Sequence, residues 1–180
     1  GWCQKVKVLV TGTGSLLLGG IASELVRRGD DVVCLQRRPS AFIGHQNAHE
    51  VLADICDAEA VAAAAHGCDA IIHGAARVGI VGSQKEFYET NVIGTSNILQ
   101  AAELHNISRL VFVSTPSVAH TGDSLIGAPA GKAKIGRSRS YYAESKAIAE
   151  RAVLNARNEH LAVVAIRPHL VWGPGDTQLV

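Results

Sequence analysis

Six short apolar runs, rich in valine and isoleucine, recur along the 180-residue chain and are bounded by turn residues. Continuous apolar runs of this length are typical of strands that are buried on both faces, as in a parallel sheet. Segments with helical periodicity separate most of them. This alternation predicts an α/β fold in which right-handed crossovers build a doubly wound parallel sheet flanked by helices. The expected strands cover residues 6–10, 32–35, 51–53, 70–72, 110–113 and 161–166, and the expected helices cover residues 16–28, 58–66, 86–105 and 141–158.

The composition favours one globular domain over residues 1–180, with 47% hydrophobic residues, 18% charged residues and a formal net charge of +1. This charge gives no electrostatic reason to expect a nucleic acid or an anionic membrane as partner. No apolar run approaches the roughly 20 residues of a membrane span, and no signal-peptide pattern opens the chain. The four cysteines are far apart and form no C-x-x-C motif, so we expect reduced thiols and a cytoplasmic protein.

A glycine-rich turn, TGTGSLLLGG at residues 11–20, follows the first expected strand, where such turns hold a dinucleotide pyrophosphate. The spacing T-G-x-x-G-x-x-G would place glycine at the positions of Ser15 and Leu18, and G-x-G-x-x-G from Gly12 would place it at Leu17. Serine either clashes with the phosphate or donates to it, and leucine either pushes the helix outward or finds a pocket. Because backbone N–H groups remain available, we predict an altered but competent phosphate loop. The alternative is a turn that holds no ligand.

Tyr142 and Lys146 are four residues apart in a helical pattern, so their side chains share one helix face. A nearby ammonium favours the phenolate and lowers the pKa of a tyrosine, which suits proton exchange with an alcohol or carbonyl. Ser114 and Thr115 follow the run at 110–113, at the sheet edge where ligands bind in open parallel sheets. Their hydroxyls can bind a substrate oxygen there, with ordinary capping of the strand end as the alternative.

In this order along the chain, the motifs resemble the extended short-chain dehydrogenase/reductase superfamily, and within it the 3β-hydroxysteroid dehydrogenase-like branch. The resemblance runs from Val6 to Asp176. It rests on the TG turn at 11–12, ADICD at 53–57, HGAARVG at 73–79, NVIGT at 91–95, FVSTPSV at 112–118, YYAESK at 141–146 and RPHLVWGPGD at 167–176. It implies a Rossmann-type NAD(P)-binding domain. Members continue beyond G-P-G-D into a carboxyl-terminal substrate region, which we expect to be missing from residues 1–180.

The resemblance also implies catalytic roles. Tyr142 resembles the acid/base, Lys146 the residue that lowers its pKa and holds the nicotinamide ribose, and Thr115 the catalytic serine or threonine. Asn91 resembles a structural asparagine that fixes the long helix. Pro116 follows Thr115 where sugar-nucleotide dehydratases usually have aspartate, which argues against dehydration.

The cofactor-contacting set combines the glycine-rich turn, two arginines and the positions that the resemblance implies. By that resemblance, residues 54–55 contact the adenine, residues 75–76 form the wall beneath the cofactor, and residues 168 and 171 flank the nicotinamide. The full expected set is Gly12, Gly14, Ser15, Leu16, Leu17, Arg37, Arg38, Asp54, Ile55, Ala75, Ala76, Ser114, Tyr142, Lys146, Pro168 and Val171.

The end of the second expected strand bears on the choice of cofactor. NAD-preferring proteins place a carboxylate there to bind the ribose hydroxyls, but this position holds Gln36, followed by Arg37 and Arg38. Arginine can bind a phosphate through two charge-assisted hydrogen bonds. We therefore predict NADP(H) over NAD(H), with Arg37 as the main contact to the 2′-phosphate and Arg38 as a secondary one. The alternative is that both arginines are solvated or pair with nearby acids.

The expected function is an NAD(P)-dependent oxidoreductase that transfers hydride between nicotinamide and a hydroxyl or carbonyl substrate. One alternative is a sugar-nucleotide epimerase that uses bound NAD. Another, suggested by Ser15 and Leu18, is a nucleotide-binding regulatory protein without turnover. The resemblance implies a homodimer that pairs through the helices at 86–105 and 141–158.

Two further features are expected to lie in solvated loops. His45 and His49 have a spacing that can bind zinc on a helix, but they lack both a helical pattern and a third ligand nearby, so no metal site is expected. Residues 119–140 are rich in glycine, serine and alanine and are expected to form a mobile loop. This loop carries the basic residues Lys132, Lys134, Arg137 and Arg139.

Overall fold

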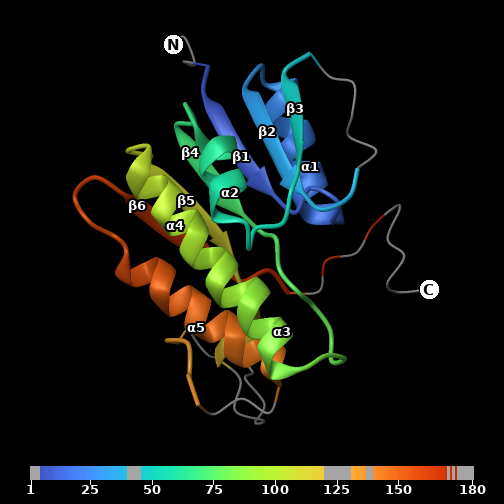
Figure 1. Cartoon of the computed structure of the whole chain (residues 1–180), viewed down its shortest axis with the longest axis vertical. Coiled ribbons are helices and arrows are strands. Elements are labelled where there is room, and N and C mark those ends of the chain that lie inside the picture. The colour runs from blue at the N-terminus through green and yellow to red at the C-terminus, as the bar shows by residue number, and fades with distance from the viewer. Residues whose placement is uncertain are drawn as a thin grey trace.

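The computed structural model describes residues 5–39, 46–119, 131–136, 140–169, 171 and 173. Within them, the strands form one six-stranded parallel sheet with the order β3-β2-β1-β4-β5-β6 (Figure 1). This order reverses direction between β1 and β4, as in a Rossmann fold, so the expected fold class is confirmed. The strands are β1 (Lys7–Thr11), β2 (Asp31–Gln36), β3 (Ala48–Leu52), β4 (Ala70–His73), β5 (Arg109–Val113) and β6 (Ala162–Ile166).

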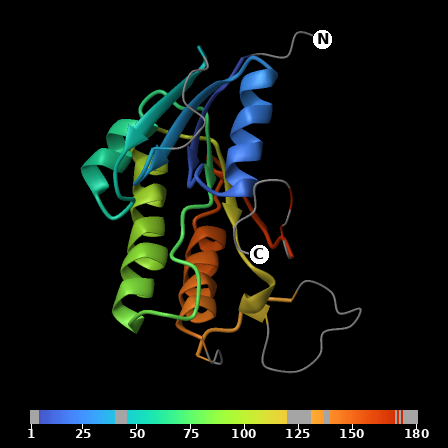
Figure 2. The ribbon, with the colours of Figure 1, turned by 90° about the vertical axis from the view of Figure 1, so that its right-hand side faces the viewer.

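Helices cover both faces of the sheet. One face is covered by α1 (Leu16–Arg27), and the other by α2 (Ala58–Ala65), α4 (Gly94–Leu104) and α5 (Tyr141–Asn155) (Figure 2). Alternate strand residues therefore face different cores. Leu9 packs with the group that contains Ile98 of α4, whereas Val10 packs with the group that contains Leu18 of α1. Burial on both faces explains why the central strands have continuous apolar sequences.

The edge strand β3 differs most from its prediction, because it starts at Ala48 rather than at residue 51. It includes the polar residues His49 and Glu50, and His49 is exposed. An edge strand is only partly covered, so it lacks the continuous apolar run that marked the other strands.

The long helix expected at 86–105 is interrupted. It consists of α3 (Gln84–Tyr88), a single π-helical turn (Glu89–Ile93) and α4. Ser83 and Glu86 form a reciprocal capping box that starts α3. The π turn has Asn91 buried within it, and such turns often occur at functional sites. The other three expected helices are confirmed, with carboxyl ends one to three residues earlier than expected.

Part of the loop expected at 119–140 is described. After β5 the chain makes a 3₁₀ turn, Pro116–Ala119. Ala133 is buried against Val118 and Ala147, and its carbonyl accepts a 2.8 Å hydrogen bond from Arg151. Lys132 and Lys134 are exposed, whereas Arg137 and Arg139 lie outside the described residues. Across the described ranges, no helix combines the length and apolar character that a membrane crossing requires.

Candidate functional site

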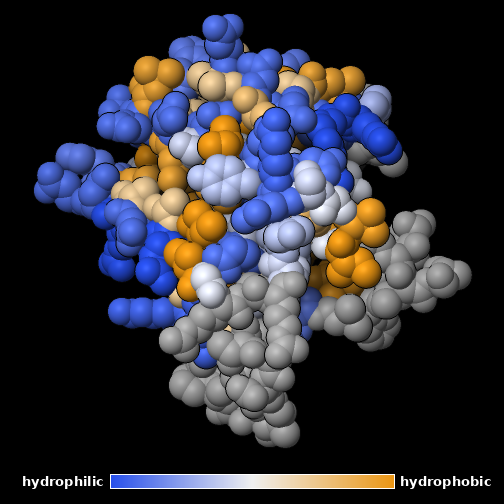
Figure 3. Space-filling view, turned by 60° about the horizontal axis from the view of Figure 1, so that its bottom comes forward, coloured by the Kyte–Doolittle hydropathy of each residue, from blue (hydrophilic) through white to orange (hydrophobic). Residues whose placement is uncertain are grey.

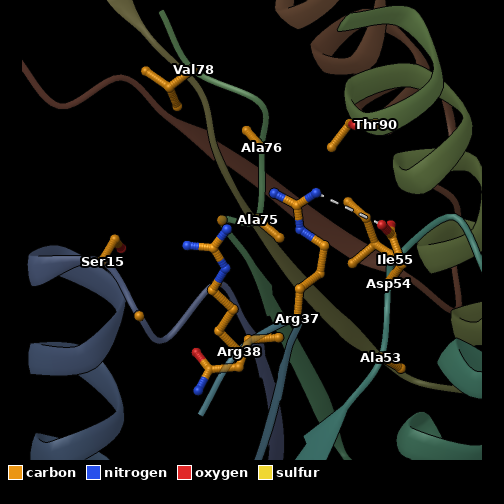
Figure 4. Close-up of a pocket in the computed structure, with 14 residues that line it drawn as sticks. Ser15, Arg37, Arg38, Ala53, Asp54, Ile55, Ala75, Ala76, Val78 and Thr90 are labelled. Atoms are coloured by element: carbon orange, nitrogen blue, oxygen red, sulfur yellow. Dashed lines mark ion pairs between the residues drawn. The ribbon is translucent and has the colours of Figure 1, made fainter. Parts of the chain in front are cut away.

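A cavity of about 390 Å³ opens where β1, β2, β3 and β4 end, at the edge where the strand order reverses (Figure 4). Nine residues of the expected cofactor-contacting set line it, namely Gly12, Gly14, Ser15, Arg37, Arg38, Asp54, Ile55, Ala75 and Ala76. Open α/β sheets bind ligands at this reversal point. The structure therefore brings together residues that the sequence analysis had selected at four separate strand ends.

Five lining residues were not in the expected set: Gln36, Ala53, Gly74, Val78 and Thr90. Gln36 ends β2, Ala53 follows β3 and Gly74 follows β4, so the strand-end rule that selected their neighbours could have found them. Thr90 lies in the π turn, which no sequence pattern predicted.

Gly12 forms the tightest approach in the cavity wall. Its φ is +83°, and a Cβ added there would lie 2.9 Å from the backbone N and Cα of Ala75. The loop after β1 and the chain after β4 thus touch backbone to backbone, which only glycine permits.

Ser15 starts α1. Its side-chain oxygen accepts a 3.3 Å hydrogen bond from the N–H of Leu18, and its backbone is extended, as in an ordinary N-cap. The serine that replaces a glycine is therefore compatible with the start of the helix.

Leu18 occupies a pocket, which was the second of the two outcomes considered for it. It is 3% exposed. A Cβ on Gly74 would lie 2.5 Å from its Cδ2, so the absence of a side chain at Gly74 provides the space. The close helix-to-loop contact falls instead at Gly19, where a Cβ would lie 2.9 Å from the carbonyl oxygen of Thr13.

The two arginines extend from the end of β2 into the cavity (Figure 4). Arg37 Nη1 lies 3.9 Å from Asp54 Oδ2, and both side chains are substantially exposed, so the ion pair is weak. Within the described ranges, no carboxylate pairs with Arg38. The pairing with an acid that was considered for both arginines is thus observed for Arg37 alone.

Gln36 is buried beneath them. Its Oε1 accepts a 2.7 Å hydrogen bond from the Thr13 hydroxyl, and its Nε2 donates to Glu50 Oε1 at 2.6 Å. Its amide is therefore already bonded on both sides, and the Glu50 carboxylate is held behind it.

A second group of polar residues lies where α5 begins, beside the end of β5. Burial raises the pKa of Tyr142, and the neighbouring Thr115 side chain lowers it by less. The Thr115 hydroxyl itself donates to the Ser117 hydroxyl at 3.2 Å. Thr115 and Tyr142, which the resemblance paired, are thus brought together.

Lys146 is one helical turn further along α5 and is 2% exposed. Its ammonium donates to the Val113 carbonyl at 2.7 Å and lies 4.1 Å from the centre of the Phe112 ring. Burial lowers its pKa to about 7. The ammonium is thus engaged at the end of β5, and the pKa of Tyr142 is raised in this structure rather than lowered as expected.

Glu150 lies one further turn along α5 and is 1% exposed. Arg167 donates to its two oxygens at 3.0 and 2.5 Å. Burial alone would raise the pKa of Glu150, but hydrogen bonds from Arg167 and the positive charges of Arg167 and Lys146 lower it. A buried charge network therefore supports the helix that carries Tyr142.

The remaining residues of the expected set do not line the cavity. Leu17 packs against the core on the α1 side, and Leu16 is 40% exposed at the start of α1. Ser114 is buried, and its backbone N–H donates to the Ile166 carbonyl at 2.7 Å. Pro168 and Val171 follow β6, outside the set that lines the cavity.

Among the residues that the structure describes, no three histidine, cysteine, aspartate or glutamate side chains are arranged to hold a metal ion. His45, the first residue of the zinc-like spacing, lies outside the described residues.

Comparisons with known proteins agree with this architecture. A model of the 3-beta hydroxysteroid dehydrogenase/isomerase family matches residues 9–180. The 2-alkyl-3-oxoalkanoate reductase of Stenotrophomonas maltophilia is 41% identical, over 97% of this chain and 54% of its own length. The 3 beta-hydroxysteroid dehydrogenase/Delta 5→4-isomerase of Mycobacterium tuberculosis is 34% identical, over 94% of this chain and 48% of its own length. The chain spans about half the length of the curated relatives it matches.

Solved structures show the same fold. The Bordetella bronchiseptica enzyme WbmH, solved in complex with NAD+, is 27% identical with a TM-score of 0.77, over 91% of this chain and 56% of its own. The protein Pal from Bacillus thuringiensis is 26% identical with a TM-score of 0.78, over 90% of this chain and 55% of its own.

Proposed function

The chain belongs to the 3-beta hydroxysteroid dehydrogenase/isomerase family, and on that premise we propose that it is the dinucleotide-binding part of an oxidoreductase. The reaction is hydride transfer between nicotinamide and a hydroxyl or carbonyl carbon of the substrate. One observation carries the proposal: the cavity at the ends of β1, β2, β3 and β4 and the neighbouring Tyr142 and Thr115 lie at the same edge of the sheet. The reductases and dehydrogenases among the relatives support it.

The cavity residues suit such a cofactor. Gly12, Gly14 and Ser15 line the cavity at the start of α1, where backbone N–H groups can bind a pyrophosphate. Apolar walls from Ile55, Ala75 and Ala76 suit the flat face of an adenine, and the guanidinium groups supply positive charge. The regulatory alternative rested on Ser15 and Leu18, and the way both are accommodated removes that reason.

The chemistry follows from these side chains. The bound dinucleotide would supply the hydride donor or acceptor. Tyr142 exchanges a proton with the substrate oxygen as general acid or base, and Thr115 holds the same oxygen by a hydrogen bond. Lys146 has three donors, of which the Val113 carbonyl takes one, so the others can bind the nicotinamide ribose. Its charge then favours the Tyr142 phenolate.

NADP(H) is the proposed cofactor in preference to NAD(H). A carboxylate at the end of β2 would repel a 2′-phosphate, but Gln36 is neutral and its amide is already bonded. Arg37 and Arg38 reach into the cavity beside it. Arg37 is the main proposed phosphate contact, because a phosphate can replace its weak, solvent-exposed partner Asp54.

Two features of the whole protein belong to the same proposal. The first is a homodimer that pairs through the helices within 86–105 and 141–158, which Leu104 and Leu154, at 65% and 44% exposed, support. The second is a cytoplasmic location, which the free thiols of Cys34, Cys56 and Cys68 support.

Titration of the chain with NADPH and with NADH tests the dinucleotide site. Gly12→Val should abolish binding, because its side chain collides with the Ala75 backbone. Gly20→Ala is the matched control, since a Cβ there has no neighbour within 4 Å. Circular dichroism checks that both variants are folded. A wild-type chain that binds neither nucleotide would contradict the proposal.

A further inference from the structure

A run of buried hydrogen bonds connects the cavity wall with the π turn. The Thr11 hydroxyl lies 2.7 Å from His73 Nδ1, and His73 Nε2 lies 3.0 Å from the Thr95 hydroxyl. The Thr95 hydroxyl in turn lies 2.6 Å from the Asn91 carbonyl oxygen. All four residues are at most 1% exposed.

The direction of each bond in this run is determined. A carbonyl can only accept, so the Thr95 hydroxyl donates its proton to Asn91. Thr95 must then accept from His73, which places the ring proton on Nε2. Nδ1 is left as an acceptor and takes the Thr11 proton. The ring is neutral, in agreement with burial lowering the pKa of His73 to about 3.

At one end, this arrangement fixes the cavity wall. Since the Thr11 proton goes to His73, the Thr11 oxygen is free to accept from the N–H groups of Gly74 and Ala75, at 3.2 and 3.1 Å. Gly74 and Ala75 line the cavity, and Gly12, the next residue after Thr11, lies against Ala75. The Thr11 hydroxyl therefore holds two walls of the cavity together.

At the other end, the run meets the helix that carries Tyr142. The Asn91 side chain accepts from the Arg77 N–H at 2.7 Å and donates to the Arg77 carbonyl at 3.1 Å. It also donates to the Ser145 hydroxyl at 2.9 Å, and Ser145 donates to the Tyr142 carbonyl at 2.9 Å. The backbone and side chain of Asn91 thus join the two halves of the site.

We propose that His73 and Thr95 are positioning residues for the dinucleotide site. Neither lines the cavity, so neither would touch the ligand. They act by fixing the Thr11 hydroxyl as a donor to His73. The Thr11 oxygen then remains free to accept from the backbone N–H groups of Gly74 and Ala75. This inference rests on the proposed function, because it takes a dinucleotide to be the ligand.

The test compares Thr95→Val, which keeps the shape but removes the hydroxyl, with Thr95→Ser, which keeps the hydroxyl. Dinucleotide titration of each folded variant should give a dissociation constant raised about tenfold for Thr95→Val, the equivalent of one lost hydrogen bond. Thr95→Ser should bind within about twofold of wild type. The free energy of unfolding of each variant, measured in parallel, identifies any loss of dinucleotide affinity that comes from partial unfolding.

The ¹⁵N spectrum of the His73 ring gives a second readout. The wild-type ring should be protonated at Nε2 alone, and Thr95→Val should lose that single tautomer. Wild-type affinity in Thr95→Val, an equal loss in Thr95→Ser, or a wild-type proton on Nδ1 would each overturn the positioning role. A wild-type chain that binds no dinucleotide would instead overturn the proposed function, and this inference with it.

Discussion

Burial determines the pKa values of two basic side chains at this site, Lys146 and His73. Lys146 and His73 are both almost completely buried, and burial lowers the pKa of each, to about 7 and about 3 respectively. Their partners differ, because Lys146 donates to a carbonyl at the end of β5, whereas His73 is held between two hydroxyls. Lys146 is therefore available to change its proton or its partner near neutral pH, and His73 is not.

Removing the Tyr142 hydroxyl tests the catalytic role directly. In the complete protein, Tyr142→Phe should lower kcat by about 10²- to 10⁴-fold, the usual scale for general acid–base catalysis. Dinucleotide affinity should change little, since Tyr142 does not line the cavity. Steady-state kinetics and a binding titration measure the two quantities, and undiminished turnover would rule out the assignment.

Arg37 tests the choice of cofactor. Arg37→Ala should weaken NADPH binding by about 1.5–3 kcal/mol, the value of a hydrogen bond to a charged group, and leave NADH binding nearly unchanged. Arg38→Ala is the comparison variant and should weaken NADPH binding less. Equal losses for both nucleotides, or a wild-type preference for NADH, would show that the end of β2 has been misinterpreted.

The buried His73 makes stability depend on pH. The folded protein takes up the proton near pH 3, but the unfolded chain does so near the usual 6.5. Its contribution to stability is therefore complete above about pH 6.5 and is lost as the pH falls toward 3.

Urea unfolding at several pH values measures this dependence. Between pH 4 and 6 the wild-type free energy of unfolding should fall more steeply than that of His73→Gln, by up to about 1.4 kcal/mol per pH unit. Above pH 7 the two slopes should agree. Parallel slopes over the whole range would show that the ring titrates normally.

Helices and strands were predicted correctly from the sequence where the burial of a single element determines its own pattern of apolar residues. The central strands were predicted because burial on both faces requires continuous apolar runs. The edge strand β3 was shifted because partial exposure permits His49 and Glu50. The π turn was not predicted, because the buried residues Phe87, Asn91, Gly94 and Ile98 keep the three- and four-residue spacing of a regular helix. The pocket for Leu18 depends on Gly74, 56 positions away in the sequence, which only the folded structure brings close.

The contact between α1 and the end of β4 makes a testable pair. Gly74→Ala should destabilise the wild type, because its Cβ would lie 2.5 Å from the buried Leu18. Leu18→Ala should cost about 2–5 kcal/mol by leaving a cavity. In that background Gly74→Ala should cost less or become stabilising, with a coupling energy of about 0.5–3 kcal/mol.

The control for this double-mutant cycle of Leu18 and Gly74 is Gly20→Ala. Gly20 lies on the same helix as Leu18, but an added Cβ there has no neighbour within 4 Å. Its effect should be the same with and without Leu18. Additive effects of Leu18→Ala and Gly74→Ala would contradict the account of how this loop tolerates leucine.

The described part of the chain has several apolar side chains that are exposed to solvent. Val78, Ile80 and Val81, in the loop after β4, are 62%, 92% and 81% exposed, and Val164 on the edge strand β6 is 54% exposed. Figure 3 shows several separate hydrophobic patches on the side that it brings forward. Val78 also lines the cavity, so this exposed apolar loop borders the proposed dinucleotide site.

The proposed function requires a dinucleotide to lie across the carboxyl ends of β1, β2 and β4. Two-dimensional ¹H–¹⁵N spectra of the labelled chain, recorded during titration with NADPH, measure this most directly. The proposed site predicts shifts concentrated at the backbone amides of Gly12, Gly14, Ser15, Ala75 and Ala76 and at the Arg37 and Arg38 side chains, with little change at the amino-terminal ends of the strands. Saturating NADPH that leaves these signals unmoved, or moves a different cluster, would contradict it.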